Sequence, residues 1–201
     1  MKNKNLLLIF TRNPELGKVK SRLAKDIGEE KALNIYSELL KHTESISAPL
    51  DCTKWVFYSE NINKNDLWSN TIFQKKLQFG NDLGIRMQNA FQEGFTSGFE
   101  NIIIIGSDIY DLQQKHIALA FTSLENNNAV IGPSDDGGYY LLGLKKMIPE
   151  VFKNKNWGTD TVLKNTLMDL ESHAPIYQLE NLNDIDVISD INPDSYLRKF
   201  I

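Results

Sequence analysis

Cysteine, long apolar runs and excess positive charge are scarce in this 201-residue chain, and each shortage excludes a class of protein. Because Cys52 is the one cysteine, the chain cannot form an internal disulfide, which is typical of proteins of the reducing cytoplasm. The apolar run in the opening "MKNKNLLLIF" stops at Thr11, too early for a secretory signal or a membrane span. The formal net charge of −4 argues against a general nucleic-acid surface. We therefore expect a cytoplasmic protein that binds neither membranes nor nucleic acids.

Repeats, low-complexity tracts and Pro/Gly-rich linkers are absent as well, and the length suits one domain, residues 1–201. Apolar runs and helical periodicity alternate along the chain. Strands are predicted at 5–11, 53–59, 101–108, 129–134, 138–144 and near 175–179. Helices are predicted at 30–46, 81–95, roughly 113–126, 159–172 and 193–200. This alternation predicts an α/β fold, a single doubly wound domain with a mostly parallel sheet.

Basic residues are concentrated directly after the first predicted strand, in "TRNPELGKVKSRL". The proline and glycine predict a turn, after which Lys18, Lys20 and Arg22 enter what looks like a helix start; Arg12 precedes the turn. Backbone N–H groups at a helix start, together with lysine and arginine, suit a polyphosphate. Neither G-x-G-x-x-G nor G-x-x-x-x-G-K-S is present, and a solvated basic helix start explains the same residues equally well.

Carboxylates follow the most apolar predicted strand and recur near the end of the chain. Asp108 comes directly after "NIIIIGS", where it could hold Mg²⁺ against a phosphate or cap the next helix. Asp184, Asp186 and Asp190 form either an acidic turn or the source of a second carboxylate for a two-carboxylate magnesium site. In "GPSDDGGYY" (132–140), two glycines allow a ligand to approach the backbone closely, although a hairpin turn would use the same residues.

A protein nucleophile is not evident in the sequence. His42, His116 and His173 are predicted on helix surfaces, and Cys52 precedes an early strand. Transfer from a nucleotide needs no protein nucleophile when the acceptor itself supplies a hydroxyl or a phosphate oriented in line.

The order of these motifs resembles a bacterial family of small transferases, the radical-SAM/selenodomain-associated, glycosyltransferase-like transferases. The resemblance runs from about residue 5 to 197 and is carried by Lys-Ser-Arg-Leu (20–23), Gly-Pro-x-x-Asp-Gly-Gly-Tyr (132–139) and Asp-x-Asp-x-x-x-Asp (184–190). It implies the glycosyltransferase-A fold of the nucleotide-diphospho-sugar transferase superfamily, in the neighbourhood of phospholactate guanylyltransferases.

The resemblance also implies roles for individual residues. It implies Mg²⁺, or Mn²⁺ in its place, held by Asp108 and Asp186, with Asp108 and Lys18 as catalytic residues. Nucleotide phosphates would be bound by Arg12, Lys18, Lys20 and Arg22, and the acceptor side would be lined by Asp136, Gly137 and Gly138. Asp82 and Arg86 match a family segment, Asp-Leu-Gly-x-Arg-Met, that a helix cap and a surface salt bridge would also explain.

Two positions depart from the family pattern. Tyr110 stands where the family usually has proline after Asp-Cys, which restores a backbone N–H and adds bulk beside the expected metal. Val187 replaces a threonine after the second aspartate, which removes a hydroxyl.

Three functions follow as alternatives. The first is a Mg²⁺-dependent glycosyltransferase-like transferase that takes a nucleotide sugar and a small-molecule acceptor, which the resemblance favours. The second is a nucleotidyltransferase that joins an NTP to a small phosphorylated acceptor and releases pyrophosphate, which the dense basic loop favours because a triphosphate carries more charge. The third, motivated by Tyr110, is a protein that binds nucleotides without turnover. The sequence carries no signal for an oligomeric state.

Overall fold

A computed structural model describes residues 3–201 and contains a seven-stranded sheet with the strand order β3-β2-β1-β4-β6-β5-β7. The strands are β1 (Asn5–Thr11), β2 (Thr53–Tyr58), β3 (Gln74–Leu77), β4 (Asn101–Ile105), β5 (Ala129–Pro133), β6 (Tyr139–Leu144) and β7 (Ile176–Gln178). Strand β6 is antiparallel to its neighbours β4 and β5, and the other strand pairs are parallel. The predicted α/β fold with a mostly parallel sheet is therefore confirmed.

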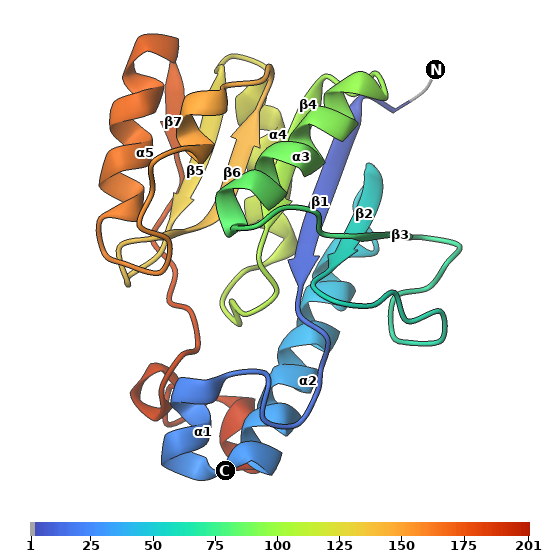
Figure 1. The fold of residues 1–201 in the computed structure, drawn as a ribbon, viewed down its shortest axis with the longest axis vertical. Helices are drawn as coiled ribbons and strands as arrows, with labels where there is room; N and C mark the ends of the chain where they lie inside the picture. Colours follow the sequence, from blue (N-terminus) through green and yellow to red (C-terminus); the bar gives the residue numbers. More distant parts are fainter. Residues whose placement is uncertain (1–2) are drawn as a thin grey trace.

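Helices cover both faces of this sheet (Figure 1). The α-helices are α1 (Ser21–Ile27), α2 (Glu29–Ser47), α3 (Leu83–Thr96), α4 (Gln114–Leu124) and α5 (Val162–Leu170). Short 3₁₀ turns are η1 (Pro149–Phe152), η2 (Glu171–His173), η3 (Ile188–Asp190) and η4 (Tyr196–Phe200). The terminal helix expected at 193–200 is thus only the 3₁₀ turn η4.

The core consists of two apolar layers, one on each face of the sheet. In β1, Leu7 and Ile9 belong to the layer that packs against α2 and α4, whereas Leu6 and Leu8 belong to the layer under α3. All four side chains are fully buried. The continuous apolar run of this strand is therefore explained by burial on both faces of a parallel sheet.

One strand was not predicted, and one histidine predicted on a helix surface is buried. Strand β3 has the sequence "QKKL" and lies at the edge of the sheet, where charged side chains replace an apolar pattern. The helix start expected in the basic segment is confirmed, because α1 begins at Ser21. His116 is 4% exposed rather than on the surface, because its Nδ1 accepts a hydrogen bond (3.1 Å) from the backbone N–H of Gln113 at the start of α4.

The loops that carry the candidate residues meet at the carboxyl edge of the sheet. Strands β1 and β4 are parallel neighbours and end together, so the loops after Thr11 and Ile105 emerge side by side. The C-terminal segment descends from β7 past this edge and lies beside α1 (Figure 1), where the backbone N–H of Ile188 donates to Asp26 (3.3 Å). Within residues 3–201, no helix has the length and apolar character needed to span a membrane.

Candidate functional site

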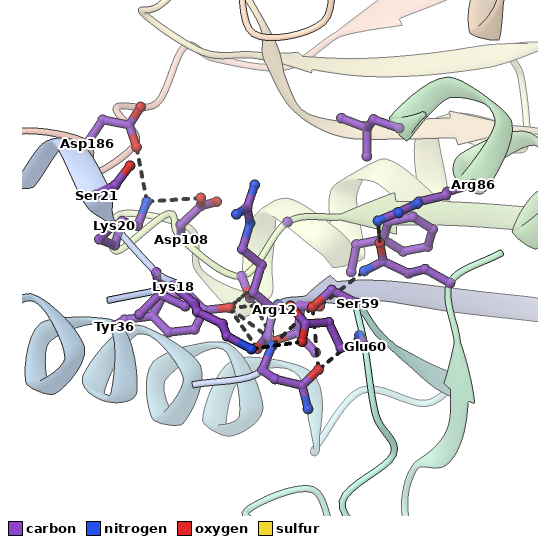
Figure 2. A pocket seen from close by; sticks show the side chains of 18 of the residues that line it. Arg12, Lys18, Lys20, Ser21, Tyr36, Ser59, Glu60, Arg86, Asp108 and Asp186 are labelled. Atoms are coloured by element: carbon purple, nitrogen blue, oxygen red, sulfur yellow. Dashed lines mark hydrogen bonds and ion pairs between the residues drawn. The ribbon is translucent and has the colours of Figure 1, made fainter. Parts of the chain in front are cut away.

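A cavity of about 770 Å³ lies at this edge of the sheet, between the basic loop, residues 78–86 and the loop after β4 (Figure 2). Such a volume is in the range of ligand sites. The four basic residues singled out from the sequence all line it, and α3 adds a fifth; the cations are Arg12, Lys18, Lys20, Arg22 and Arg86.

Lys20 is the central residue of the cavity. Its backbone lies in the left-handed region (φ 47°, ψ 48°), a strained conformation for a residue with a side chain that is characteristic of functional sites. Its side chain is 5% exposed, and Nζ lies 3.0 Å from Oδ2 of Asp108 and 3.3 Å from Oδ1 of Asp186. Burial disfavours the ammonium, but the two carboxylates outweigh it and raise the pKa of Lys20.

Asp108 and Asp186 therefore converge as the sequence analysis expects (Figure 2). Each presents an oxygen within 3.3 Å of the same nitrogen, so the pair already holds one cation between them. Attraction by Lys20 outweighs burial and lowers the pKa of Asp108. Two ionised carboxylates facing a cavity are the donor set that a hard cation such as Mg²⁺ takes, so the residues present fit this metal.

Two other contacts position Asp186. Nη1 of Arg22 lies 3.1 Å from its Oδ2. Oδ2 of Asp190 accepts hydrogen bonds from the backbone N–H groups of Asp186 (2.8 Å) and Val187 (2.7 Å), so Asp190 orients the loop rather than facing the cavity. Among the described residues no group of three or more His, Cys, Asp or Glu side chains is arranged to hold a metal. Water and substrate oxygens would have to supply the remaining ligands.

Tyr36 of α2 joins the two loops beneath the cavity. Its buried hydroxyl accepts a hydrogen bond from the backbone N–H of Arg12 (2.9 Å) and lies 3.2 Å from Oγ1 of Thr11 and 3.3 Å from Oγ of Ser107. Helical periodicity places Tyr36 only on the apolar side of α2, so its role was missed from the sequence. The residue type alone could have indicated this role, because a tyrosine hydroxyl on the buried side of a helix needs hydrogen-bond partners.

The basic side chains differ in how far they are neutralised. Lys18 lies 2.7 Å from Glu15 and 3.2 Å from Glu60, and hydrogen bonds to these two carboxylates raise its pKa. In contrast, the exposed guanidinium of Arg12 has no hydrogen-bond or ion-pair partner among residues 3–201, and it extends toward the part of the cavity that contains Asp108 (Figure 2). Arg12 is thus the cation most available to an anionic ligand.

The segment Leu-Gly-x-Arg-Met forms the start of α3 and one wall of the cavity. Asp82 caps this helix by accepting a hydrogen bond from Ile85 N (2.9 Å), which confirms the helix-cap explanation. Nε of Arg86 donates to the carbonyl of Gly80 (2.9 Å) rather than pairing with Asp82. A Cβ on Gly84 would lie 2.2 Å from a backbone oxygen of η1 and 2.8 Å from the ring of Trp157, so only glycine admits this packing.

A second cavity of about 260 Å³ adjoins the first, and the two share Asp108 in their walls. Of the three residues predicted for the acceptor side, Asp136 and Gly138 line this cavity and Gly137 does not. Gly137 has a left-handed backbone (φ 84°), and a Cβ there would lie 2.4 Å from the carbonyl oxygen of Asp160. Gly137 therefore shapes the loop rather than contacting the cavity.

Asp184 also lines the second cavity, together with Trp157. Burial, strengthened by the nearby carboxylates of Asp136, Asp186 and Asp108, raises the pKa of Asp184 to about 6. The sequence pointed to an acidic cluster here but could not separate the roles of its members, and nothing in the sequence singled out Trp157.

Tyr110 does not add bulk at the carboxylate pair, contrary to the expectation from the sequence. Its ring packs against His42 of α2, with 4.9 Å between ring centroids, and it lines neither cavity. The change from proline therefore leaves the cavities open.

Comparison with known proteins agrees with this architecture. Residues 43–159 match a family described as "Uncharacterized protein conserved in bacteria (DUF2064)". A Desulfovibrio desulfuricans G20 protein, provisionally named a nucleotide-diphospho-sugar transferase, is 29% identical, with a TM-score of 0.86 over 98% of this chain and 94% of that one. No curated protein matches the chain.

More distant structures share the fold. The inositol-1-phosphate CTP transferase of T. maritima is 13% identical, with a TM-score of 0.56 over 100% of this chain and 97% of its own. The 4-diphosphocytidyl-2C-methyl-D-erythritol synthase of Anaerococcus prevotii DSM 20548 is 10% identical, with a TM-score of 0.55 over 94% and 92%. These solved structures carry the names of nucleotidyl- and sugar-nucleotide transferases.

Proposed function

The chain belongs to the DUF2064 family of bacterial proteins, and from this premise we propose that it is a Mg²⁺-dependent, glycosyltransferase-like transferase that uses a nucleotide sugar as donor. The observation that carries the proposal is the convergence of Asp108, Asp186 and Lys20 in a cavity into which Arg12 extends unpaired. A nucleoside diphosphate group needs this combination of a cation-binding carboxylate pair and a free guanidinium.

Ion pairing within the cavity favours a diphosphate donor over a triphosphate. The sequence suggested a triphosphate because the loop is densely basic, but Lys18, Lys20 and Arg22 each face a carboxylate of the protein itself. The positive charge available to a ligand is therefore smaller than the composition of the loop implies.

The protein's own residues would act by binding and orientation. The Arg12 guanidinium would donate two hydrogen bonds to phosphate oxygens, and Lys20 would exchange a carboxylate contact for a phosphate contact. Mg²⁺ between Asp108 and Asp186 would neutralise charge that develops on the leaving diphosphate. The acceptor hydroxyl oxygen bonds to the anomeric carbon as the bond from that carbon to the diphosphate breaks. The hydroxyl proton passes to a phosphate oxygen of the departing nucleoside diphosphate.

Nucleotidyl transfer is the second candidate, and the fold shared with the T. maritima CTP transferase supports it. In that reaction an acceptor oxygen would bond to the α-phosphorus of an NTP and pyrophosphate would leave. The third alternative, a protein that binds nucleotides without turnover, was suggested by Tyr110 alone. It has no support in the structure, because Tyr110 lies outside both cavities.

Ligand binding followed by product identification tests the proposal. Thermal shift and calorimetry with nucleoside diphosphates, nucleotide sugars and NTPs, each with and without Mg²⁺, should detect binding to the wild type. Binding should be markedly weaker in Arg12→Ala and unchanged in Lys41→Ala, whose exposed side chain pairs with Glu38 on α2 away from the cavity. Release of nucleoside diphosphate supports glycosyl transfer, and release of pyrophosphate supports nucleotidyl transfer. Failure of every nucleotide to bind at millimolar concentration with Mg²⁺ would refute both.

A further inference from the structure

The second cavity has room for a small organic molecule. Its volume is about 260 Å³, well above the roughly 30 Å³ that one water molecule occupies in the liquid. Phe10, Leu83, Gly106 and Asp108 line both cavities, so a molecule held in the second would lie next to one held in the first.

The walls of this cavity are mainly apolar and aromatic. Aromatic side chains come from β1, β6 and the loop before α5, and aliphatic ones from α3, α5 and the loop after β4; the main examples are Phe10, Tyr139, Tyr140, Trp157, Met87, Ile109 and Val162. Trp157 is held against α3 by the close approach that Gly84 allows. Such walls suit an apolar body rather than a bare hydrated ion.

The charge of the cavity is of one sign. Among the described residues that line it there are three carboxylates, Asp108, Asp136 and Asp184, and no lysine, arginine or histidine. Asp108 is paired with Lys20 from the side of the first cavity.

The two remaining carboxylates face the cavity without a cation. One oxygen of Asp136 accepts hydrogen bonds from the Ser134 hydroxyl and from Gly138 N (2.8 Å). The partly buried carboxylate of Asp184 has no hydrogen-bond or ion-pair partner within residues 3–201. A partly buried carboxylate without a partner is destabilising, and a cationic ligand would relieve that cost.

We infer that the second cavity binds the acceptor substrate and that this acceptor is an organic cation, a molecule that carries an amine or quaternary ammonium group on an apolar body beside its reacting hydroxyl, and not a phosphate ester. Identification of the occupant as the acceptor rests on the proposed function; its charge and shape rest on the cavity alone. The ammonium group pairs with Asp184 and Asp136, and the surrounding rings add cation–π attraction. A phosphorylated acceptor would instead face carboxylates with no cation to receive it.

Three probes of similar shape and different charge test the inference directly. 2-Phenylethylamine is cationic, 2-phenylethanol is neutral and 2-phenylethyl phosphate is anionic, and each is titrated into the wild-type protein in EDTA while binding is followed by NMR. We expect the amine to bind at least fivefold more tightly than the alcohol and the phosphate to bind most weakly. Equal or tighter binding of the phosphate overturns the inference, and this comparison needs no variant.

Variants then locate the site. Asp184→Asn and Asp136→Asn should each weaken amine binding at least fivefold, while Asp135→Asn should leave it unchanged. Asp135 is a matched control because it precedes Asp136 on the same loop but does not line the cavity; it accepts a hydrogen bond from Asn181 instead (3.3 Å). Unchanged amine binding in both cavity variants overturns the inference. So does displacement of the amine by millimolar Mg²⁺ alone, because the carboxylates would then form a metal site.

The outcome can be separated from that of the proposed function. Nucleotide binding is measured on the same variants, and it depends on the first cavity. Amine binding without any nucleotide binding would support the inference that the second cavity binds an organic cation, and it would refute the proposed transferase function. Nucleotide binding together with a preference for the phosphate probe would refute only the inference.

Discussion

The ammonium nitrogen of Lys20 lies 3.0 Å from Oδ2 of Asp108, 88 positions away in the sequence. Because it also contacts Asp186, it occupies the position between two carboxylates that a divalent cation would take. A lysine expected to bind phosphate thus neutralises the expected metal ligands. If the proposed function holds, binding of nucleotide and metal would require Lys20 to leave the carboxylates, and a phosphate oxygen would offer it a new partner.

Replacement of Lys20 by methionine tests this coupling. In Lys20→Met the two carboxylates lose their cation, so we expect Mn²⁺, measured by electron paramagnetic resonance without nucleotide, to bind at least fivefold more tightly than in the wild type. Nucleotide binding should weaken about tenfold, which corresponds to about 1.4 kcal/mol. Lys25→Met, at the exposed end of α1, is the control and should change neither. Weaker Mn²⁺ binding in Lys20→Met would contradict the idea that Lys20 and the metal compete for the same two carboxylates.

Arg12 and Lys18 should differ in their contributions to nucleotide binding. The Arg12 guanidinium has no partner among residues 3–201, so Arg12→Ala should weaken binding by about 1.5–3 kcal/mol, the range of a hydrogen bond to a charged group. Lys18 already pairs with Glu15 and Glu60 at the surface, so Lys18→Ala should weaken nucleotide binding less than Arg12→Ala does. Calorimetry with one nucleotide and Mg²⁺ measures both. The reverse order of the two losses would show that Lys18 leaves its carboxylates to bind phosphate.

The Tyr36 hydroxyl should matter for both stability and ligand binding. Tyr36→Phe removes the acceptor for Arg12 N–H, so we expect a loss of about 1–2 kcal/mol in the free energy of unfolding and weaker nucleotide binding. Tyr58→Phe is a matched control, because its hydroxyl donates to Asp66 (2.6 Å) and does not line the cavity. It should lower stability by a similar amount while leaving nucleotide binding intact. Equal nucleotide binding by Tyr36→Phe and the wild type would reduce Tyr36 to a structural residue.

Much of the fold follows from apolar runs, which report burial directly. The run in β1 predicted a strand covered on both faces, and the structure has it with the bounds expected from the sequence. Strand β3 could not be predicted, because a lysine-rich edge strand has no apolar pattern. The contact of Lys20 with Asp108 depends on a left-handed backbone at Lys20 and on the parallel register of β1 and β4. Neither property can be predicted from the local sequence. The residue types therefore indicated which side chains lie at the cavity, but not that Lys20 forms ion pairs with the carboxylates.

The acidic cluster shows the same limit. Asp184, Asp186 and Asp190 are indistinguishable as residue types, yet one faces the second cavity, one faces Lys20 and one caps the loop. The role of each carboxylate depends on how the C-terminal segment crosses the carboxyl edge of the sheet beside α1. This is a long-range arrangement that the local sequence does not specify. The family resemblance selected Asp186, and the structure adds Asp184 to the candidate site.

The titration of Asp184 provides a last prediction, with a defined sign. Its pKa is raised from the usual 3.8 to about 6, so the folded protein binds this proton more tightly than the unfolded chain does. Stability therefore falls as pH rises from about 4 to about 6 and stays lower above that range. Asp184→Asn removes the effect, so we expect it to raise the free energy of unfolding at pH 8 by about 1–2 kcal/mol, once solvent screening of this partly exposed group is included.

Near pH 4, where the folded protein holds this proton and the unfolded chain begins to bind it, the variant should gain much less from this source. Urea unfolding at pH 8 and at pH 4 in EDTA measures the difference, with Asp135→Asn as the control for removal of a nearby carboxylate outside the cavity. EDTA is needed because a bound cation would lower the pKa of Asp184 and mask the effect. A loss of stability at pH 8 in Asp184→Asn would mean that the charged carboxylate is favourable where it lies, and the cavity would then contain a cationic partner already.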